Sequence, residues 1–349
     1  MKDTWLPFLS GTDDKVLLAP SGNIEAALRN AEVQGNGFTW GGKNPLFGFQ
    51  HHPLAGGVET YSVISTGHHF AAITGTVAHR LEAGSSINVA VGLLRLGIVP
   101  ADIRLIVPQG ADLVGQELAA TLQARRVETL LLPANETGFA LNVHTSDNRS
   151  TIFGRRPDYQ VSDEFLAALR ARAPRLAVLS SIRPVDLPIA EAVFASRAKR
   201  RVLVAHQELL LRSDLRDRLQ ALVARADLFQ ANRSEAAQLL GLSQPEEFRP
   251  EMIAEIASFG ARYSVVTLDG DGAIMMGPNG EIFRQEAFPV ENIDPIGAGD
   301  VHLAVLSFFL WLHGGVGPQE ALRRAAKGAA HKVTREGSWS GAPTAAECE

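Results

Sequence analysis

The segment Asp294-Pro295-Ile296-Gly297-Ala298-Gly299-Asp300 leads directly into an apolar run at residues 301–312. The run has the composition of a buried helix and is too short to cross a bilayer. The turn from Gly297 to Gly299 would place unhindered backbone N–H groups at the start of this helix, where the helix dipole adds positive potential. Such a turn can hold the oxygens of a transferring phosphoryl group. Asp300 would then accept a proton from an attacking hydroxyl, although an aspartate that only favours the helix dipole is the simpler alternative.

Upstream of this segment, from about residue 84 onward, short apolar runs alternate with helical patterns. The predicted strands are 103–107, 176–180, 201–205, 228–231 and 264–268, and the predicted helices are 113–123, 189–198, 215–225, 234–240 and 252–259. This alternation predicts βαβ units and a mostly parallel sheet with helices on both faces. Ligands bind beyond the carboxyl ends of the strands in such sheets, so functional residues are expected in the loops that follow them.

Residues 26–83 have a different pattern, because glycines interrupt them repeatedly. The runs 61–65 and 69–74 have the alternation typical of β-strands. A small β-rich excursion from an α/β body is typical of a lid that closes over a site and excludes water. We therefore expect one α/β domain formed by residues 1–25 and 84–349, with residues 26–83 inserted into it as a lid.

Two pairs of adjacent histidines, at 51–52 and 68–69, lie in this glycine-rich region. No cysteine and no HExxH spacing accompany them. Adjacent residues on a strand point to opposite faces, so neither pair would present two ligands to one ion. We expect these histidines not to bind a metal.

Composition excludes several classes of protein. The chain has 349 residues with 46% hydrophobic and 20% charged, which is ordinary for a globular protein, and its net charge of −5 argues against a nucleic-acid partner. The one cysteine, Cys348, excludes a disulfide framework and suits a reducing compartment. Residues 1–15 contain no apolar core of signal-peptide length. A cytoplasmic protein with neither a membrane nor a nucleic-acid partner is therefore expected.

A second polar segment, Asn232-Arg233-Ser234-Glu235, follows a short predicted strand and opens a helix. An asparagine and a glutamate three residues apart can orient a hydrated Mg²⁺ on phosphate groups, because this hard cation prefers oxygen ligands and retains water. A helix cap with an acidic first turn is the alternative and would be favoured if the segment stood alone.

Two further segments carry glycines at the ends of predicted elements. Residues 265–273 are a buried strand that runs into a turn with Gly270 and Gly272, where the backbone can approach a nucleotide. A plain β-turn is the alternative there. Residues 84–97 form a capped helix ended by glycine, and Asn88 falls near its N-terminus, where its amide can point at a substrate.

In order and spacing these segments resemble the ribokinase-like (PfkB) carbohydrate kinases, over residues 84–343. The most specific match is Asp294-x-x-Gly297-Ala298-Gly299-Asp300, to which Asn232-x-x-Glu235 adds, and the Gly84-x-x-x-Asn88 helix is a looser match. Thr137-Gly138 with residues 147–150 resembles the hairpin region of that family, and residues 325–337 resemble the helix and loop that flank the adenine.

The resemblance implies a three-layer α/β/α domain with a central mostly parallel sheet and a small β lid. It implies an ATP-dependent kinase that transfers the γ-phosphoryl group to a hydroxyl of a sugar or sugar-like molecule. The resemblance implies that Asp300 is the base and that Gly297, Ala298 and Gly299 form the anion hole. Asn232 and Glu235 would orient Mg²⁺ and phosphate, with Glu235 reaching the metal through water. Thr267, Gly270 and Gly272 would contact the nucleotide, and Gly84 and Asn88 would face the acceptor. The loop that begins at Asp294 would hold a monovalent cation such as K⁺ through backbone oxygens. A homodimer formed through the lid is a further expectation.

The sequence departs from the family pattern at three places. Asp269 stands where the family usually has glycine, so the nucleotide loop is expected to differ in shape. Residues 205–207 replace the usual acidic strand end followed by asparagine. Asn23 and Glu25 follow the first strand in place of an aspartate that grips sugar hydroxyls. We expect one of them, with Asn88, to bind the acceptor under a lid around residues 61–80. Ribose, a hexose, a nucleoside or a less common acceptor all stay open.

Two other classes of function fit parts of the pattern. A non-catalytic sugar or nucleotide sensor would share the fold, but it would not need Asp300 or the glycine turn. A nucleotide-dependent dehydrogenase would share the alternation of strands and helices, but no Gly-x-Gly-x-x-Gly follows the first strand. A kinase is therefore the preferred interpretation, with a nucleoside kinase of the same fold as its nearest variant.

Overall fold

The computed structural model describes residues 16–19, 23–35, 48–53, 58–65, 68–144, 149–155 and 157–349. Side chains are described for residues 16–19, 84–140 and 157–349. No helix in these ranges is both long enough and apolar enough to cross a membrane.

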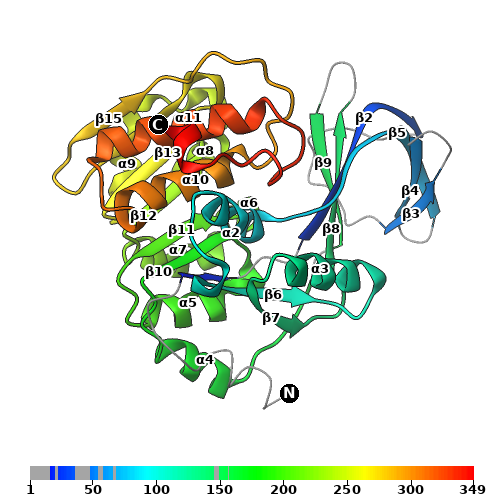
Figure 1. Cartoon of the computed structure of the whole chain (residues 1–349), viewed down its shortest axis with the longest axis horizontal. Coiled ribbons are helices and arrows are strands. Elements are labelled where there is room, and N and C mark those ends of the chain that lie inside the picture. Colours follow the sequence, from blue (N-terminus) through cyan, green and yellow to red (C-terminus); the bar gives the residue numbers. More distant parts are fainter. Residues whose placement is uncertain are drawn as a thin grey trace.

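The larger of two sheets has, among the described residues, nine strands in the order β15-β14-β13-β12-β11-β10-β1-β6-β7 (Figure 1). Their bounds are β1 Val16–Ala19, β6 Ile103–Gln109, β7 Glu128–Pro133, β10 Leu176–Ile182, β11 Arg201–Ala205, β12 Leu228–Asn232, β13 Tyr263–Thr267, β14 Ala273–Met276 and β15 Ile282–Gln285. Pairing is parallel from β7 to β13 and antiparallel from β13 to β15. The mostly parallel sheet predicted from the alternating pattern is confirmed.

Helices cover both faces of this sheet, and each face has its own hydrophobic core. One core is packed by α4 Asp163–Arg170, α5 Leu187–Ala195, α6 Gln207–Leu210, α7 Arg216–Val223, α8 Arg233–Leu240 and α9 Ile253–Ala257. The other is packed by α2 Ser85–Arg95, α3 Leu113–Ala124, α10 Ala298–Ser307, α11 Pro318–Val333 and α12 Ala345–Cys348. The chain therefore forms the predicted three layers.

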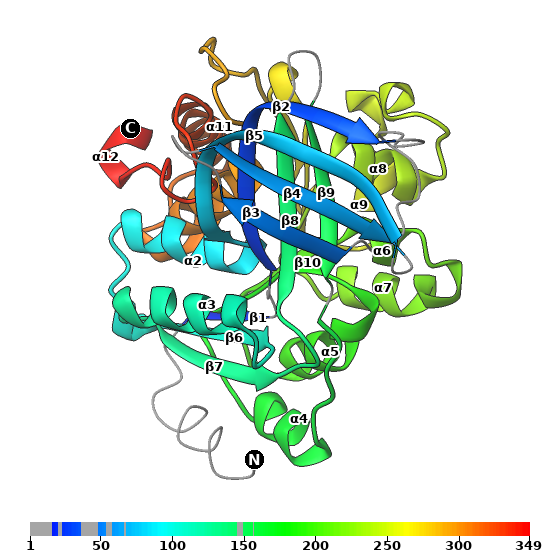
Figure 2. The ribbon, with the colours of Figure 1, turned by 90° about the vertical axis from the view of Figure 1, so that its right-hand side faces the viewer.

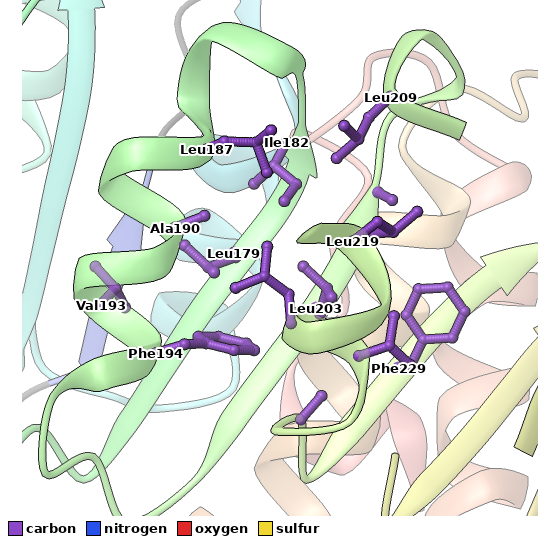
Figure 3. Packing of buried hydrophobic residues seen from close by; sticks show 14 of the residues in the cluster. Leu179, Ile182, Leu187, Ala190, Val193, Phe194, Leu203, Leu209, Leu219 and Phe229 are labelled. Atoms are coloured by element: carbon purple, nitrogen blue, oxygen red, sulfur yellow. The ribbon is translucent and has the colours of Figure 1, made fainter. Parts of the chain in front are cut away.

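Polar and apolar residues do not alternate along strand β1, and the position of the strand in the sheet explains why. Leu17 and Ala19 belong to the first core, whereas Val16 and Leu18 belong to the second, and all four are buried. Successive side chains of a strand point to opposite faces, so a central strand covered on both faces must be apolar throughout. Figure 3 shows the first core, where side chains of α5 such as Leu187 and Phe194 pack toward the strands beside them.

The predicted strands and helices from residue 103 to 268 all exist, and most of their bounds agree to within two residues. Strand β7, helix α4 and the hairpin of β14 and β15 were not predicted. The apolar run at 301–312 is buried, as predicted, and continues from α10 into a π-helical turn at Phe308–Leu312.

A second sheet stands beside the α/β body (Figures 1 and 2), with the strand order β3-β4-β5-β2-β8-β9. The strands are β2 Asn23–Gly35, β3 Gly48–Pro53, β4 Val58–Ser65, β5 His68–Ala83, β8 Gly138–His144 and β9 Arg149–Arg155. The predicted strands 61–65 and 69–74 fall inside β4 and β5, and the hairpin expected after Thr137 is β8 and β9. Four strands of this sheet precede residue 84 in the chain, and β8 and β9 follow residue 137. Its closure over the site as a lid stays a prediction.

Candidate active site

The glycine turn lies at the N-terminus of α10, as the sequence predicted. Gly297 precedes the helix with φ of 80°, and a Cβ there would lie 2.4 Å from the carbonyl oxygen of Ser338. Both constraints require glycine at this position. The backbone N–H of Ala298 donates to the carbonyl oxygen of Pro295 at 3.1 Å. The amides of Gly299 and Asp300 lie in the first helical turn, where backbone N–H groups have no intrahelical partner, and their role in holding phosphoryl oxygens stays a prediction.

The carboxylate of Asp300 is fixed by side chains from α2. Asn88 Nδ2 donates to Asp300 Oδ2 at 2.8 Å, and the Ser85 hydroxyl donates to Asp300 Oδ1. Because Ser85 has a single proton, Ser180 on β10 is the donor in its hydrogen bond with the Ser85 oxygen. Helix α2 directly, and strand β10 through Ser85, thus orient one half-buried carboxylate.

Burial raises the pKa of Asp300 from its usual 3.8 to about 6, and the hydrogen bonds from Ser85 and Asn88 partly oppose this rise. Desolvation disfavours the charged form, whereas donors to the carboxylate favour it. A carboxylate with this pKa is ionised at pH 7 and still accepts a proton more readily than an ordinary aspartate. These are the properties that a general base requires.

Asn88 is buried, and both ends of its amide are occupied by protein groups. Its Nδ2 donates to Asp300, and its Oδ1 accepts from the Ser338 hydroxyl at 3.0 Å. The helix that carries it packs very closely on α10, since a Cβ at Gly92 would lie 2.9 Å from Ala304 Cβ. The structure therefore places Asn88 against the predicted base, and its contact with an acceptor stays a prediction.

The other predicted acceptor residues lie at the start of α2 and on β2. Gly84 is buried and is the residue directly before α2. Asn23 and Glu25 are on β2, where their backbones pair in parallel with Gly138 and Ala140 of β8. The side chains of Asn23 and Glu25 lie outside the described residues, so their predicted role is not tested by any contact.

Asn232 and Glu235 form a reciprocal cap at the start of α8. Glu235 N donates to Asn232 Oδ1 at 2.8 Å, and Asn232 N donates to Glu235 Oε2 at 2.9 Å. Burial raises the pKa of Glu235 from 4.5 to about 7, the hydrogen bond from Asn232 opposes the rise, and the charge of Asp300 adds to it. The capping alternative is therefore present, and it leaves Glu235 Oε1 outside the cap.

These two residues also fit a hydrated Mg²⁺. The described part of the chain contains no group of three or more His, Cys, Asp or Glu side chains suited to bind a metal. Mg²⁺ bound to a nucleotide needs only one or two carboxylates, because phosphate oxygens and water complete its shell. Burial and the charge of Asp300 raise the pKa of Glu235, so its ionisation costs free energy when no cation is near. A bound Mg²⁺ would reduce this cost, because an opposite charge favours the ionised carboxylate.

A cavity of about 550 Å³ opens beside the glycine turn. Its apolar wall includes Phe288, Pro289, Val290, Ala326, Ala330 and Val333, and its polar end includes Asn232, Thr267, Gly270, Gly272 and Gly299. This volume is in the range of small-molecule and nucleotide sites. The predicted nucleotide contacts and the glycine turn therefore line one cavity.

The loop after β13 holds Asp269 in a backbone conformation that favours glycine, and the expected difference in loop shape from the family stays a prediction. Asp269 adopts φ of 53°, the left-handed region that few residues other than glycine, asparagine and aspartate occupy. Gly272 has φ of 94°, and a Cβ there would lie 2.0 Å from the carbonyl oxygen of Gln285. Glycine is thus required at 272, whereas the backbone at 269 keeps a glycine-like conformation with a carboxylate added.

The family model described as pfkB family carbohydrate kinase matches residues 76–345. This chain belongs to the pfkB family of carbohydrate kinases. It is therefore a phosphotransferase that uses an alcohol group as acceptor, in a family of ATP-dependent sugar kinases.

Solved structures show the same fold at low sequence identity. The pfkB kinase described here matches Giardia lamblia ribokinase with a TM-score of 0.66 and 17% identity over 97% of this chain and 98% of that one. It matches Arabidopsis thaliana ribokinase complexed with ribose and ATP with a TM-score of 0.65 and 18% identity over 97% and 98% of the two chains. Phosphofructokinase-2 from Escherichia coli, in complex with potassium, gives 0.64 and 17% over 97% of each. These likenesses establish the three-layer fold alone.

Sequence reasoning missed a polar pair beneath the cavity of this pfkB kinase. Gln230 on β12 donates through Nε2 to the carbonyl oxygen of Gly299 at 3.0 Å, and its Oε1 lies 2.8 Å from His302 Nδ1. Because Oε1 can only accept, His302 must carry its proton on Nδ1. Burial lowers the pKa of His302 to about 4, so the ring is neutral. A histidine inside an apolar helix was the signal available in the sequence.

His302 lines the cavity, and its Nε2 is buried with no hydrogen-bond partner among the described residues. In the tautomer fixed by Gln230, this nitrogen is an acceptor. An unsatisfied buried acceptor is costly, and a ligand donor or a water molecule would offset that cost. Ser85, Ser180 and Ser338 were also missed, because nothing in a single serine indicates which distant carboxylate or amide it contacts.

Proposed function

We propose that this kinase transfers the γ-phosphoryl group of ATP to a hydroxyl of a sugar or sugar-like small molecule, with Asp300 as general base. The observation that carries the proposal is the carboxylate of Asp300. Its pKa is raised to about 6, two side chains of α2 orient it, and it stands at the glycine turn beside the large cavity. A sensor on this fold would gain nothing from a half-buried carboxylate whose pKa is raised toward neutrality.

The proton transfer follows from that geometry. The acceptor hydroxyl donates to Asp300, which takes the proton as the hydroxyl oxygen forms its bond to the γ-phosphorus. The bond from the γ-phosphorus to the bridging oxygen breaks, and its electron pair leaves with ADP. Ser85 and Asn88 hold the carboxylate in place during this step, and Asp300 then releases the proton to water.

Fixed backbone N–H donors would stabilise the negative charge on the transferring phosphoryl group. The amides of Gly299 and Asp300 are oriented by α10 before the substrate binds, so they need no reorganisation in the transition state. Gln230 holds the Gly299 peptide through its carbonyl oxygen. Asn232 and Glu235 would hold a hydrated Mg²⁺, which supplies charge neutralisation on the phosphate oxygens.

The donor nucleotide is proposed to occupy the 550 Å³ cavity. Alanine and valine side chains of α11 and the segment 287–290 form an apolar wall suited to a flat base. The glycines after β13 allow close approach of the backbone to the sugar and phosphates.

The proposal is tested by incubating the protein with ATP and Mg²⁺ against a panel of pentoses, hexoses, sugar acids and nucleosides. ADP and the phosphorylated acceptor are both measured, and Asp300→Asn serves as the inactive control. We expect acceptor-dependent ADP release with a sugar or a sugar derivative. Acceptor binding without any phosphorylated product, across the whole panel, would support the sensor instead and refute the proposal.

A further inference from the structure

The side chain of Lys332, in the last turn of α11, is completely buried. Its ammonium donates to the carbonyl oxygen of Asp294 at 2.7 Å and to the carbonyl oxygen of Arg335 at 3.4 Å. It lies 4.0 Å from the carboxylate oxygen Oδ1 of Asp294, which is also fully buried. A lysine charge is therefore enclosed by backbone carbonyl oxygens together with one carboxylate.

These oxygens belong to two loops that meet at the base of the active site. Asp294 begins the turn that ends at Asp300, and Arg335 lies in the loop after α11. The loops are also joined by two further hydrogen bonds, since Asp294 N donates to Val333 O at 3.0 Å and Gly337 N donates to Asp294 Oδ2 at 3.0 Å. The ammonium therefore lies where the glycine turn is anchored to the rest of the fold.

A cage of backbone carbonyl oxygens with one carboxylate is also the environment that a potassium ion takes. The resemblance to the family implied such an ion on the backbone oxygens of the loop that begins at Asp294. The structure does not fit that expectation, because the carbonyl oxygen of Asp294 already accepts a hydrogen bond from Lys332. A second cation in the same space would meet both steric overlap and repulsion from the ammonium.

We propose that the Lys332 ammonium takes the place of a monovalent cation in this kinase. A primary ammonium group resembles potassium in charge and size, and here the chain itself holds it. The ammonium is covalently part of the chain, and breaking its buried ion pair with Asp294 would be strongly destabilising. The positive charge therefore stays in the site whichever salt is in solution. The turn that presents the amides of Gly299 and Asp300 is thus braced without any ion from solution, and activity is independent of potassium.

The first test uses the wild-type protein. Its melting temperature is measured in potassium chloride and in choline chloride at equal ionic strength. We expect a difference of no more than about 1 °C, because no ion binds selectively to the native state. The rate of sugar phosphorylation, which rests on the proposed function, should be equally insensitive. A saturable, potassium-specific rise in melting temperature or rate would overturn the proposal.

The second test uses two substitutions that differ in the space they leave. Lys332→Ala leaves room for an ion, whereas Lys332→Met fills the same volume with apolar atoms. We expect both to melt about 5–10 °C lower in choline chloride, because Asp294 loses its buried partner. Potassium or ammonium ions should then stabilise the alanine variant saturably, raise its rate by at least about 10-fold, and leave the methionine variant unchanged.

Lys327→Ala is the matched control, because Lys327 lies on the same helix, is partly exposed, and is outside the cage. It should show no response to potassium. If the alanine variant folds but gains nothing from potassium or ammonium, Lys332 is only a cross-link and the inference fails. If neither Lys332 variant folds, the wild-type titration decides alone. Because melting needs no acceptor, a failure of the proposed kinase activity would leave this result readable.

Discussion

Replacing Asp300 with asparagine should reduce kcat and, at the same time, stabilise the protein at alkaline pH. Asparagine keeps the shape of the side chain, accepts a hydrogen bond from Asn88 through its oxygen, and donates to Ser85 through its nitrogen. It cannot take a proton from the acceptor. We therefore expect kcat to fall by about 10²–10⁴-fold while nucleotide binding persists.

The effect on stability follows from the pKa. Asp300 has a folded pKa of about 6 against an ordinary 3.8, a difference worth about 3 kcal/mol of unfolding free energy. Because the residue is half-buried, water should reduce this to about 1–2 kcal/mol. A carboxylate whose folded pKa is raised contributes stability below the unfolded pKa and loses that contribution as the pH rises through the folded pKa. The variant should thus gain stability at pH 8 and about half as much at pH 5.

The assay is urea unfolding of both proteins at pH 5 and pH 8, followed by tryptophan fluorescence, with kcat measured on the same preparations. Asp217→Asn is the control, because Asp217 also lies in the first turn of a helix but is exposed. It should change neither quantity. A variant at position 300 that turns over normally removes Asp300 from the mechanism. One that is less stable than wild type at pH 8 shows that the carboxylate serves the structure.

Three further substitutions separate the other roles. Glu235→Gln keeps the cap on Asn232 but removes the charge, so the Mg²⁺ concentration for half-maximal rate should rise; an unchanged Mg²⁺ dependence would make Glu235 a cap alone. Asn88→Ala removes a hydrogen bond that lowers the pKa of Asp300, so the acid limb of the pH profile of kcat should move to higher pH. A rise in acceptor KM as well would support the predicted acceptor contact. If the pH profile and the acceptor KM both stay unchanged, both roles of Asn88 are excluded. His302→Phe keeps an aromatic ring but deletes the buried Nε2 acceptor, so the KM for ATP should rise about 5–30-fold with acceptor KM unchanged; equal effects on both would show that Nε2 makes no contact specific to the nucleotide.

Local patterns in the sequence determined the fold class and the position of the glycine turn. Strand β1 is apolar at every position because it is covered on both faces, and the alternation that continues from β6 to β13 gives the parallel sheet. Gly297 and Asp300 could be assigned to a helix start, since a positive φ before the helix and an acidic first turn are local properties. The Asn232–Glu235 spacing predicted both a cap and a cation contact, and only the cap is visible in the hydrogen bonds.

What surrounds each of these residues was decided by tertiary structure. Asp300 is held by Ser85 and Asn88, which are 215 and 212 positions away in the chain. The ammonium of Lys332 reaches Asp294 across 38 positions, whereas the family resemblance had implied a free cation there. Periodicity and turn chemistry report only on neighbours a few residues apart. The partner of a buried polar group depends on which helices pack together, and here that was fixed by the close contact of α2 with α10 at Gly92 and Ala304.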